Sequence, residues 1–310
     1  MIEVKELTKT HGDRTAVDRL CLTARPGAVT ALLGAAGAGK TSTLRLILGL
    51  DSPSAGTVAV GGVPLRGRPR SPHQIGSLPD PAELPGRRTA GAWLGALARA
   101  HGIGAGRVAE VLAETGLSRE PRRRVATYSP AMRQRLRIAV ALLGDPPVLL
   151  LDEPLAGLDA EGVRWARRLL RSLAAQGRTV VITGDRAAQT AQTADRIIVL
   201  DRGRRVLAQS AAEFAARGAA ARVVVGTPRR GELAAVLTGG GASVVRASRS
   251  GPGRLAVTGM TAERVGALAT EHGIVILELD TRKPTLEEAL AELCAGPRVV
   301  SAPCAPAGGR

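Results

Sequence analysis

The feature that most constrains this chain is a glycine-rich segment, GAAGAGKTS, at residues 34–42. An apolar run at 29–33 predicts a buried strand before it, and the apolar spacing over 41–50 predicts a helix after it. The spacing G-x-x-x-x-G-K-[ST] between a strand and a helix is typical of a loop that binds nucleotide phosphates. Glycines let the backbone wrap closely, so that its N–H groups point at phosphate oxygens. We therefore expect the whole segment to line a nucleotide site: Gly34, Ala35, Ala36, Gly37, Ala38, Gly39, Lys40, Thr41 and Ser42.

Four side chains near this loop predict that the nucleotide is ATP, bound together with Mg²⁺. Lys40 would neutralise the β- and γ-phosphates, and Thr41 offers a hydroxyl to the metal. A second apolar strand, at 148–151, delivers Asp152 at its carboxyl end, which is where open α/β sheets bind their ligands. Asp152 is expected to hold Mg²⁺ through water. Glu153 is expected to polarise a water molecule for attack on the γ-phosphate.

Strand and helix signals alternate along the first two thirds of the chain. Beyond those already named, strands are expected at 58–60, 179–183 and 196–200, and helices at 90–100, 108–115, 132–143 and 161–175. Residues 61–88 are rich in Gly, Pro and Arg and are expected to form loops. Strands that alternate with helices imply a mostly parallel sheet, so the predicted fold class is α/β, with a nucleotide-binding domain over residues 1–217.

The order of the signals changes beyond a small-residue stretch at 215–221, which we interpret as a linker. Strands are expected at 222–225, 243–247, 254–258 and 274–279, and helices at 232–237, 262–271 and 286–293. Strand–helix–strand–strand–helix–strand is the ferredoxin-like order, so a small C-terminal α+β domain is expected over residues 222–295. Residues 296–310 are rich in Pro, Gly and Ala and are expected to be disordered.

Composition limits the partners that we expect. The formal net charge of +16 and the pI near 11.4 would suit nucleic acid or an anionic membrane face. Nearly all the cations are arginine, beside abundant alanine and glycine, which favours the codon bias of a GC-rich genome as the cause. Aromatic residues make up only 1%, so a surface that stacks bases is disfavoured and no nucleic-acid partner is expected. No apolar run reaches the ~18 residues of a membrane span, so if this protein works at a membrane, a partner has to supply the spanning helices.

Four ordered motifs resemble those of the ATPase subunit of an ABC transporter, and the resemblance covers residues 1–215. The segment 34–42 is similar to the Walker A motif of that family, and VLLLDEP from residue 148 is similar to Walker B with its glutamate. AGLDA resembles the D-loop, with Asp159 facing a partner subunit, and MRQRLRIAVALLGDP resembles the helix after the signature motif. More loosely, residues 222–293 resemble the C-terminal extension of drug-resistance-type (daunorubicin-type) exporter ATPases.

The signature motif departs from the family pattern, which is usually LSGGQ. Here it reads Tyr128-Ser129-Pro130-Ala131-Met132. The resemblance implies that Ser129 donates to the γ-phosphate held by the opposite subunit. Ala131 replaces a glycine whose N–H approaches that phosphate, and Pro130 has no N–H to offer. We therefore expect Ser129 and Ala131 to act on the partner's ATP, with a weakened set of donors.

Three further positions differ from the family pattern. Asp185 stands where the family has its switch histidine, and an anionic aspartate cannot donate a hydrogen bond to the γ-phosphate. We keep it as a candidate catalytic position. Asp80 occupies the place of the Q-loop glutamine and could still meet Mg²⁺ or water. His11 takes the place of the aromatic residue that stacks on adenine, and an imidazole can stack with a smaller area.

The resemblance implies an energy-coupling subunit of a multidrug or antibiotic-type exporter. Two such subunits, in a homodimer or heterodimer, would sandwich two ATP molecules and drive a separate transmembrane permease from the cytoplasmic face of the cell membrane. Lys40 and its loop are intact, so ATP binding should be retained. The departures at Pro130, Ala131 and Asp185 should slow hydrolysis. Two alternatives stay open: a non-hydrolysing regulatory ABC subunit, and a soluble ABC protein that acts on the ribosome or DNA.

Overall fold

The computed structural model describes residues 1–64, 71–78, 84–219, 222–246, 254–282 and 285–295. By its contacts the chain divides into two units, and each is described by itself below. The first is Met1–Phe214 together with the residues from Leu290 onward, and the second is Ala215–Ala289. The predicted disordered tail at 296–310 and the metal candidate Asp80 lie outside the described residues.

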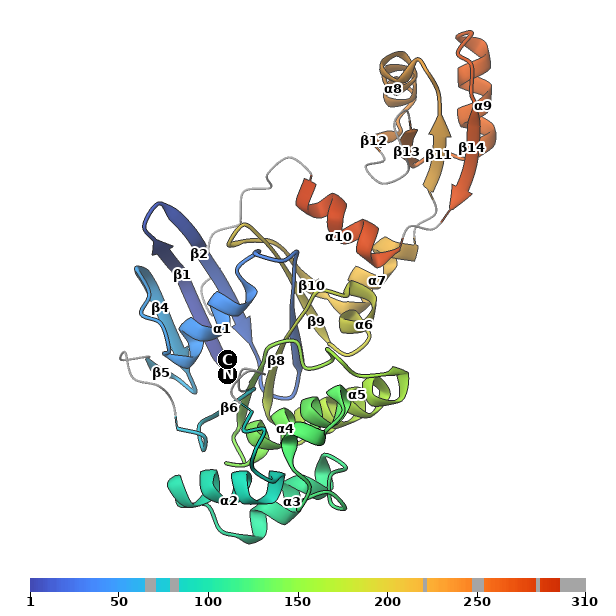
Figure 1. The fold of residues 1–310 in the computed structure, drawn as a ribbon. Helices are drawn as coiled ribbons and strands as arrows, with labels where there is room; N and C mark the ends of the chain where they lie inside the picture. Colours follow the sequence, from blue (N-terminus) through green and yellow to red (C-terminus); the bar gives the residue numbers. More distant parts are fainter. Residues whose placement is uncertain (65–70, 79–83, 220–221, 247–253, 283–284, 296–310) are drawn as a thin grey trace. The chain divides into compact units, whose positions relative to one another are not determined.

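A six-stranded sheet forms the centre of the first unit (Figure 1). Its order is β10-β9-β3-β8-β7-β6, and all neighbours are parallel except the pair β10 and β9. Every residue of β3, β7 and β8 is buried, which explains their continuous apolar runs. The strands are β3 (Val29–Leu33), β6 (Ile75–Ser77), β7 (Val148–Leu151), β8 (Thr179–Gly184), β9 (Arg196–Asp201) and β10 (Arg204–Ser210).

A second, antiparallel sheet of order β2-β1-β4-β5 packs over the first. Side chains from both sheets and from helix α1 share one apolar core, which includes Ile2, Leu20, Leu32, Leu46 and Ile198. Of the strands in this sheet, the apolar patterns of the sequence predicted only β4, and only in part. The strands are β1 (Ile2–His11), β2 (Arg14–Ala24), β4 (Ala55–Val60) and β5 (Val63–Pro64).

The helices that were predicted for the first unit, α1 to α5, agree with their predicted positions to within about two residues at each end, whereas α6 and α7 were not predicted. Helices α2 and α3 contact each other, and α3 contacts α4, so that these three form a helical part beside the sheet (Figure 1). The helices that lie wholly in the first unit are α1 (Lys40–Leu48), α2 (Ala90–Ala100), α3 (Gly106–Glu114), α4 (Pro130–Leu142), α5 (Ala160–Ala175) and α6 (Ala187–Ala191). Two more helices, α7 (Ala211–Ala219) and α10 (Leu286–Ala295), extend across the division between the two units.

Two expectations for connecting segments are wrong. Residues 61–88 are not loop throughout, because β6 pairs with β7 there; a Cβ at Gly76 would lie 1.9 Å from the carbonyl oxygen of Ala141, so only glycine fits. The expected linker at 215–221 is largely occupied by α7, since its alanines favour helix more than any other residue does.

The second unit contains β11 (Arg222–Gly226), α8 (Arg230–Gly239), β12 (Ser243–Arg246), β13 (Arg254–Thr258), α9 (Ala262–Glu271) and β14 (Glu278–Arg282). The sheet order is β12-β13-β11-β14, fully antiparallel, and both helices contribute to its core. The strand expected at 274–279 starts four residues later than expected. Ile274 is buried as the pattern suggested, but Val275 and Leu277 are exposed and precede the regular ladder.

Candidate nucleotide site

The glycine-rich loop connects β3 to α1 and is packed tightly against neighbouring backbone. A Cβ at Gly34 would lie 2.4 Å from the carbonyl oxygen of Leu200, and one at Gly39 would lie 2.5 Å from that of Ala16. Gly39 also has a φ of +98°, which disfavours any residue with a side chain. Glycine is therefore required at both positions to bring the loop into this shape.

The ammonium group of Lys40 lies inside the loop. The side chain is buried, and Nζ donates hydrogen bonds to the carbonyl oxygens of Gly34 at 2.8 Å and Ala35 at 3.0 Å. Both partners are neutral, so these contacts orient the charge without cancelling it. The N-cap of α1 is Gly39, which supplies no side-chain acceptor to the first amides of the helix. A fixed cation and open helix N–H groups together favour an anion at this place.

Asp152 and Thr41, which are far apart in sequence, meet at the carboxyl ends of β7 and β3. Thr41 Oγ1 donates to Asp152 Oδ2 at 2.7 Å, and Thr183 Oγ1 donates to the other oxygen, Oδ1. A hydroxyl and a carboxylate side by side are the hard oxygen donors that Mg²⁺ prefers, and this ion usually takes one or two protein groups together with substrate phosphates. Across the described part of the chain, no three His, Cys, Asp or Glu side chains gather in a metal-binding group.

Glu153 has an exposed side chain and an unusual backbone, with φ at +49°. Its N–H donates to Thr183 Oγ1 at 2.8 Å, and its carbonyl accepts from Gln134 Nε2 at 3.1 Å. Gln134 is buried on α4 and in turn accepts from Arg137 Nη1 at 2.7 Å. Thr183 thus joins the predicted residues Asp152 and Glu153, and Asp152 in turn contacts Thr41. From the sequence, Thr183 is predicted only as the end of a strand.

The signature segment forms the start of α4. Ser129 is the N-cap, and its exposed hydroxyl accepts from the N–H of Met132 at 3.2 Å. Pro130 is the first helical residue, a position where its missing N–H costs the helix nothing. Tyr128 anchors the segment by donating to the carbonyl of Glu120 at 2.7 Å, and burial raises the pKa of Tyr128. None of the described contacts joins Ser129 or Ala131 to the phosphate loop of the same chain.

The remaining candidates lie around the loop. Asp185 is exposed and follows directly after β8, two residues beyond Thr183. His11 is exposed at the end of β1, where it pairs with Arg14 across the β1–β2 turn. This turn lies beside the loop, because a Cβ placed on Gly37 would be 3.8 Å from Arg14 Nη2.

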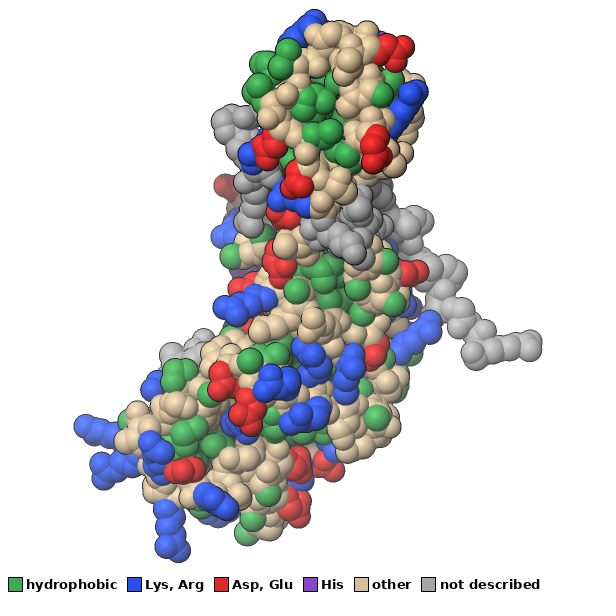
Figure 2. All heavy atoms as spheres, turned by 90° about the vertical axis from the view of Figure 1, so that its right-hand side faces the viewer, with side chains coloured by type: hydrophobic (Ala, Val, Ile, Leu, Met, Phe, Trp, Pro, Cys, Tyr) green, Lys and Arg blue, Asp and Glu red, His purple; other side chains and the backbone are tan. Residues whose placement is uncertain are grey.

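On the face drawn in Figure 2, Lys and Arg side chains occur at several separate places, with Asp and Glu side chains among them. Of the helices that the structure describes, none is both long and apolar enough to cross a membrane.

Comparison with known sequences gives matches along nearly the whole chain. The model of the ABC transporter family matches residues 17–156, and a model described as a domain of unknown function (DUF8746) matches residues 221–287. Daunorubicin resistance ATP-binding protein DrrA3 of Streptomyces coeruleorubidus is 34% identical, over 96% of this chain and 97% of its own length. Nod factor export ATP-binding protein I of Burkholderia orbicola is 36% identical, over 66% of this chain and 69% of its own length.

Solved structures give a matching fold for the first unit. The dimeric structure of a bacterial ABC transporter cassette aligns with a TM-score of 0.63 at 26% identity, over 68% of this chain and 99% of its own. A dimeric post-hydrolysis cassette bound to ADP and Pi aligns with a TM-score of 0.62 at 25% identity, again over 68% of this chain and 99% of its own. Both alignments support the α/β fold with a phosphate-binding loop.

Proposed function

Because this chain belongs to the family of ABC transporter ATP-binding proteins, we propose that it is the energy-coupling subunit of an exporter, driving a separate membrane permease with ATP. It carries the ATPase domain of that family, and its relatives include a Nod factor export ATP-binding protein and a daunorubicin resistance ATP-binding protein. The observation that carries the proposal is the joined set of Lys40 in the loop and Thr41 against Asp152. These residues bring a cation and two oxygen donors suited to Mg²⁺ to the same loop and strand ends, as the binding of a nucleotide with its metal requires.

The site residues have distinct roles in this proposal. Lys40 and the loop N–H groups hold the β- and γ-phosphates, and Thr41 and Asp152 hold Mg²⁺. When bound, Mg²⁺ would neutralise charge that develops on the phosphate oxygens. Glu153 accepts a proton from the attacking water, and its backbone is held by hydrogen bonds at its N–H and its carbonyl. His11 lies beside the loop on the β1–β2 turn, where its imidazole would stack on the adenine.

A second subunit completes each site. Ser129 and Ala131 have no contact with the loop of their own chain among the described residues, which is what a donor for the opposite subunit requires. Asp159 caps α5 by accepting from the N–H of Gly162 at 2.7 Å, and it would face the partner at the dimer interface. The dimeric structures of similar cassettes support this arrangement.

Hydrolysis is slow in this account, while ATP binding is retained. Pro130 has no N–H, Ala131 replaces a glycine, and Asp185 cannot donate to the γ-phosphate. Loss of one oriented donor typically costs on the order of 10²–10³ in rate. Lys40, by contrast, is present and is held in the loop by its hydrogen bonds to the carbonyl oxygens of Gly34 and Ala35, so ATP binding does not depend on the altered positions.

The wider setting follows from the same family. The protein would act at the cytoplasmic face of the cell membrane, held there by its permease, and the similarity to a daunorubicin resistance protein favours a drug or antibiotic as cargo. The ATP-binding domain would cover residues 1–217. The α+β domain over 222–295 would help to stabilise the dimer. The regulatory and the ribosome- or DNA-directed alternatives gain no support from the comparisons.

Nucleotide binding and phosphate release from the purified chain, alone and with its permease, test the proposal. Lys40→Ala should abolish ATP binding, whereas Glu153→Gln should bind ATP and release no phosphate. Lys9→Ala is the control. The Lys9 ammonium donates a hydrogen bond to the carbonyl of Ser52, away from the loop, so this variant should behave as wild type. Equal ATP affinity in Lys40→Ala and wild type would contradict the proposed site.

A further inference from the structure

The Thr183 hydroxyl is buried at the end of β8, between the two acidic residues of the site. A hydroxyl has one proton to donate. The N–H of Glu153 can only donate, so Thr183 Oγ1 must accept there, at 2.8 Å. Its single proton is therefore directed to Asp152 Oδ1. The direction of both hydrogen bonds is fixed by this chemistry.

The contact with Asp152 determines how its carboxylate is turned. With Oδ1 held by Thr183, the other oxygen, Oδ2, faces Thr41 at 2.7 Å. Oδ2 and the Thr41 hydroxyl are the two protein oxygens that fit Mg²⁺. Groups that orient a metal ligand without touching the metal commonly matter for both affinity and activity.

The contact with Glu153 fixes its backbone. A φ of +49° is uncommon for a residue with a side chain, and such conformations persist only where neighbouring bonds hold them. Thr183 holds the N–H, and Gln134 holds the carbonyl. One hydroxyl thus sets the position of the metal-side carboxylate and of the residue next to it.

We propose that Thr183 is a positioning residue of the ATPase site, which orients Asp152 toward the metal and holds Glu153 in place for hydrolysis. The inference rests on the proposed function and adds a residue that none of the motifs names. It concerns the hydroxyl alone, because the methyl group of threonine can be kept while the hydroxyl is removed. Thr183→Val makes that change with almost the same shape, and Thr183→Ser keeps the hydroxyl.

The test compares ATP binding in EDTA, the Mg²⁺ concentration needed for nucleotide binding, and kcat and KM. Thr183→Val should bind ATP normally in EDTA. The Mg²⁺ concentration that it needs for nucleotide binding should rise, and its kcat should fall, each by roughly 10–100-fold. Thr183→Ser should retain wild-type values. Thr179→Val is the matched control, because Thr179 is also buried on β8, at its opposite end, where its hydroxyl accepts from the Met1 ammonium at 3.2 Å. It should leave all these quantities unchanged.

Wild-type Mg²⁺ dependence and kcat in Thr183→Val would overturn the inference, and so would an equal loss in Thr183→Ser. If the valine variant does not fold, Thr183→Ala should show the same increase in the Mg²⁺ requirement, and a wild-type requirement there would overturn the inference. A wild-type protein that neither binds MgATP nor releases phosphate would contradict the proposed function itself. The two failures are therefore distinguishable.

Discussion

Two glycines of the phosphate loop differ in how closely other backbone approaches them. Gly39 and Gly37 both have positive φ, at +98° and +79°. A Cβ at Gly39 would meet the carbonyl oxygen of Ala16 at 2.5 Å, whereas a Cβ at Gly37 would meet only the end of the Arg14 side chain at 3.8 Å. At Gly39 the neighbouring group is the backbone of Ala16, which cannot shift as the end of a flexible side chain can.

This difference predicts unequal effects of alanine at the two positions. Gly37→Ala should lower the free energy of unfolding by about 1–2 kcal/mol, the cost of a left-handed residue with a side chain. Gly39→Ala adds a clash with backbone, so it should lose more stability and also lose ATP affinity. Urea unfolding and nucleotide binding of the two variants measure this. Equal losses of stability would mean that the contact with Ala16 does not constrain the loop.

Residues whose roles follow from a local motif were accessible from the sequence. Lys40, Thr41, Asp152 and Glu153 can be predicted as site residues because each stands at a fixed spacing beside an apolar strand. Thr183 was not found as part of the site, because its contacts with Asp152 and Glu153 cross from one strand to the next. A buried threonine at a strand end looks the same in sequence whether or not its hydroxyl has such partners.

At the scale of elements, helix α4 combines a structural cap with a proposed contact to the partner's ATP. Ser129 can be separated into these two roles, since aspartate caps helices about as well as serine but cannot donate. Ser129→Ala should lower the free energy of unfolding by about 0.5–2 kcal/mol, and Ser129→Asp should keep it near wild type. Both should lose hydrolysis.

The control for these variants is another N-cap in the same unit. Thr89 caps α2 by accepting from the N–H of Ala92 at 3.3 Å. Thr89→Ala should lose stability as Ser129→Ala does, with hydrolysis retained. Chemical unfolding and phosphate release measure both effects. Wild-type hydrolysis in Ser129→Asp would show that the hydroxyl does not serve the partner's nucleotide.

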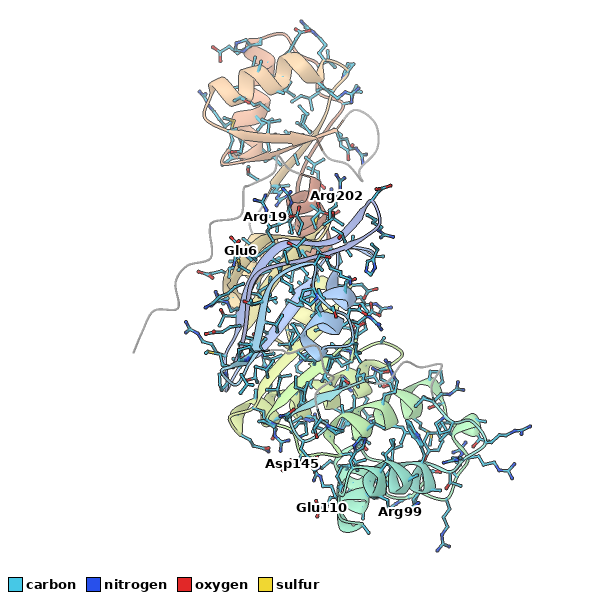
Figure 3. The ribbon with its side chains drawn as sticks, turned by 90° about the vertical axis from the view of Figure 1, so that its left-hand side faces the viewer. Glu6, Arg19, Arg99, Glu110, Asp145 and Arg202 are labelled. Atoms are coloured by element: carbon cyan, nitrogen blue, oxygen red, sulfur yellow. The ribbon has the colours of Figure 1, made fainter. Side chains whose placement is uncertain are left out.

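Elements with a continuous apolar run or a clear helical period were predicted well, and irregular ones were not. Strands β1 and β2 pair with three register shifts, and Glu6 and Arg19 within them have positive φ (Figure 3). Such bulges interrupt the alternation by which a half-exposed strand is recognised. Strand β6 is only three residues long, and its glycine, Gly76, resembles a loop residue in sequence. These strands can be recognised only from the strands with which they pair.

Across the protein as a whole, the groups proposed to bind ATP are separate from those proposed to hydrolyse it. The loop, Lys40 and the Thr41–Asp152 contact are complete within one chain. The donors expected from a second subunit are reduced, and the exposed Asp185, directly after β8, occupies the position at which we expect the switch histidine of the family. Neither composition nor fold shows this separation, because it depends on single residues within a common framework.

ATP turnover of Asp185→His, measured at saturating MgATP beside wild type, shows whether hydrolysis is slow because of Asp185. One oriented donor is worth on the order of 10²–10³ in rate, so the variant should turn over at least about tenfold faster than wild type, with unchanged ATP affinity. Asp280→His, an exposed aspartate on β14 in the second unit, makes the same change in charge and should have no effect. Equal turnover in Asp185→His and wild type would contradict the claim that Asp185 limits hydrolysis.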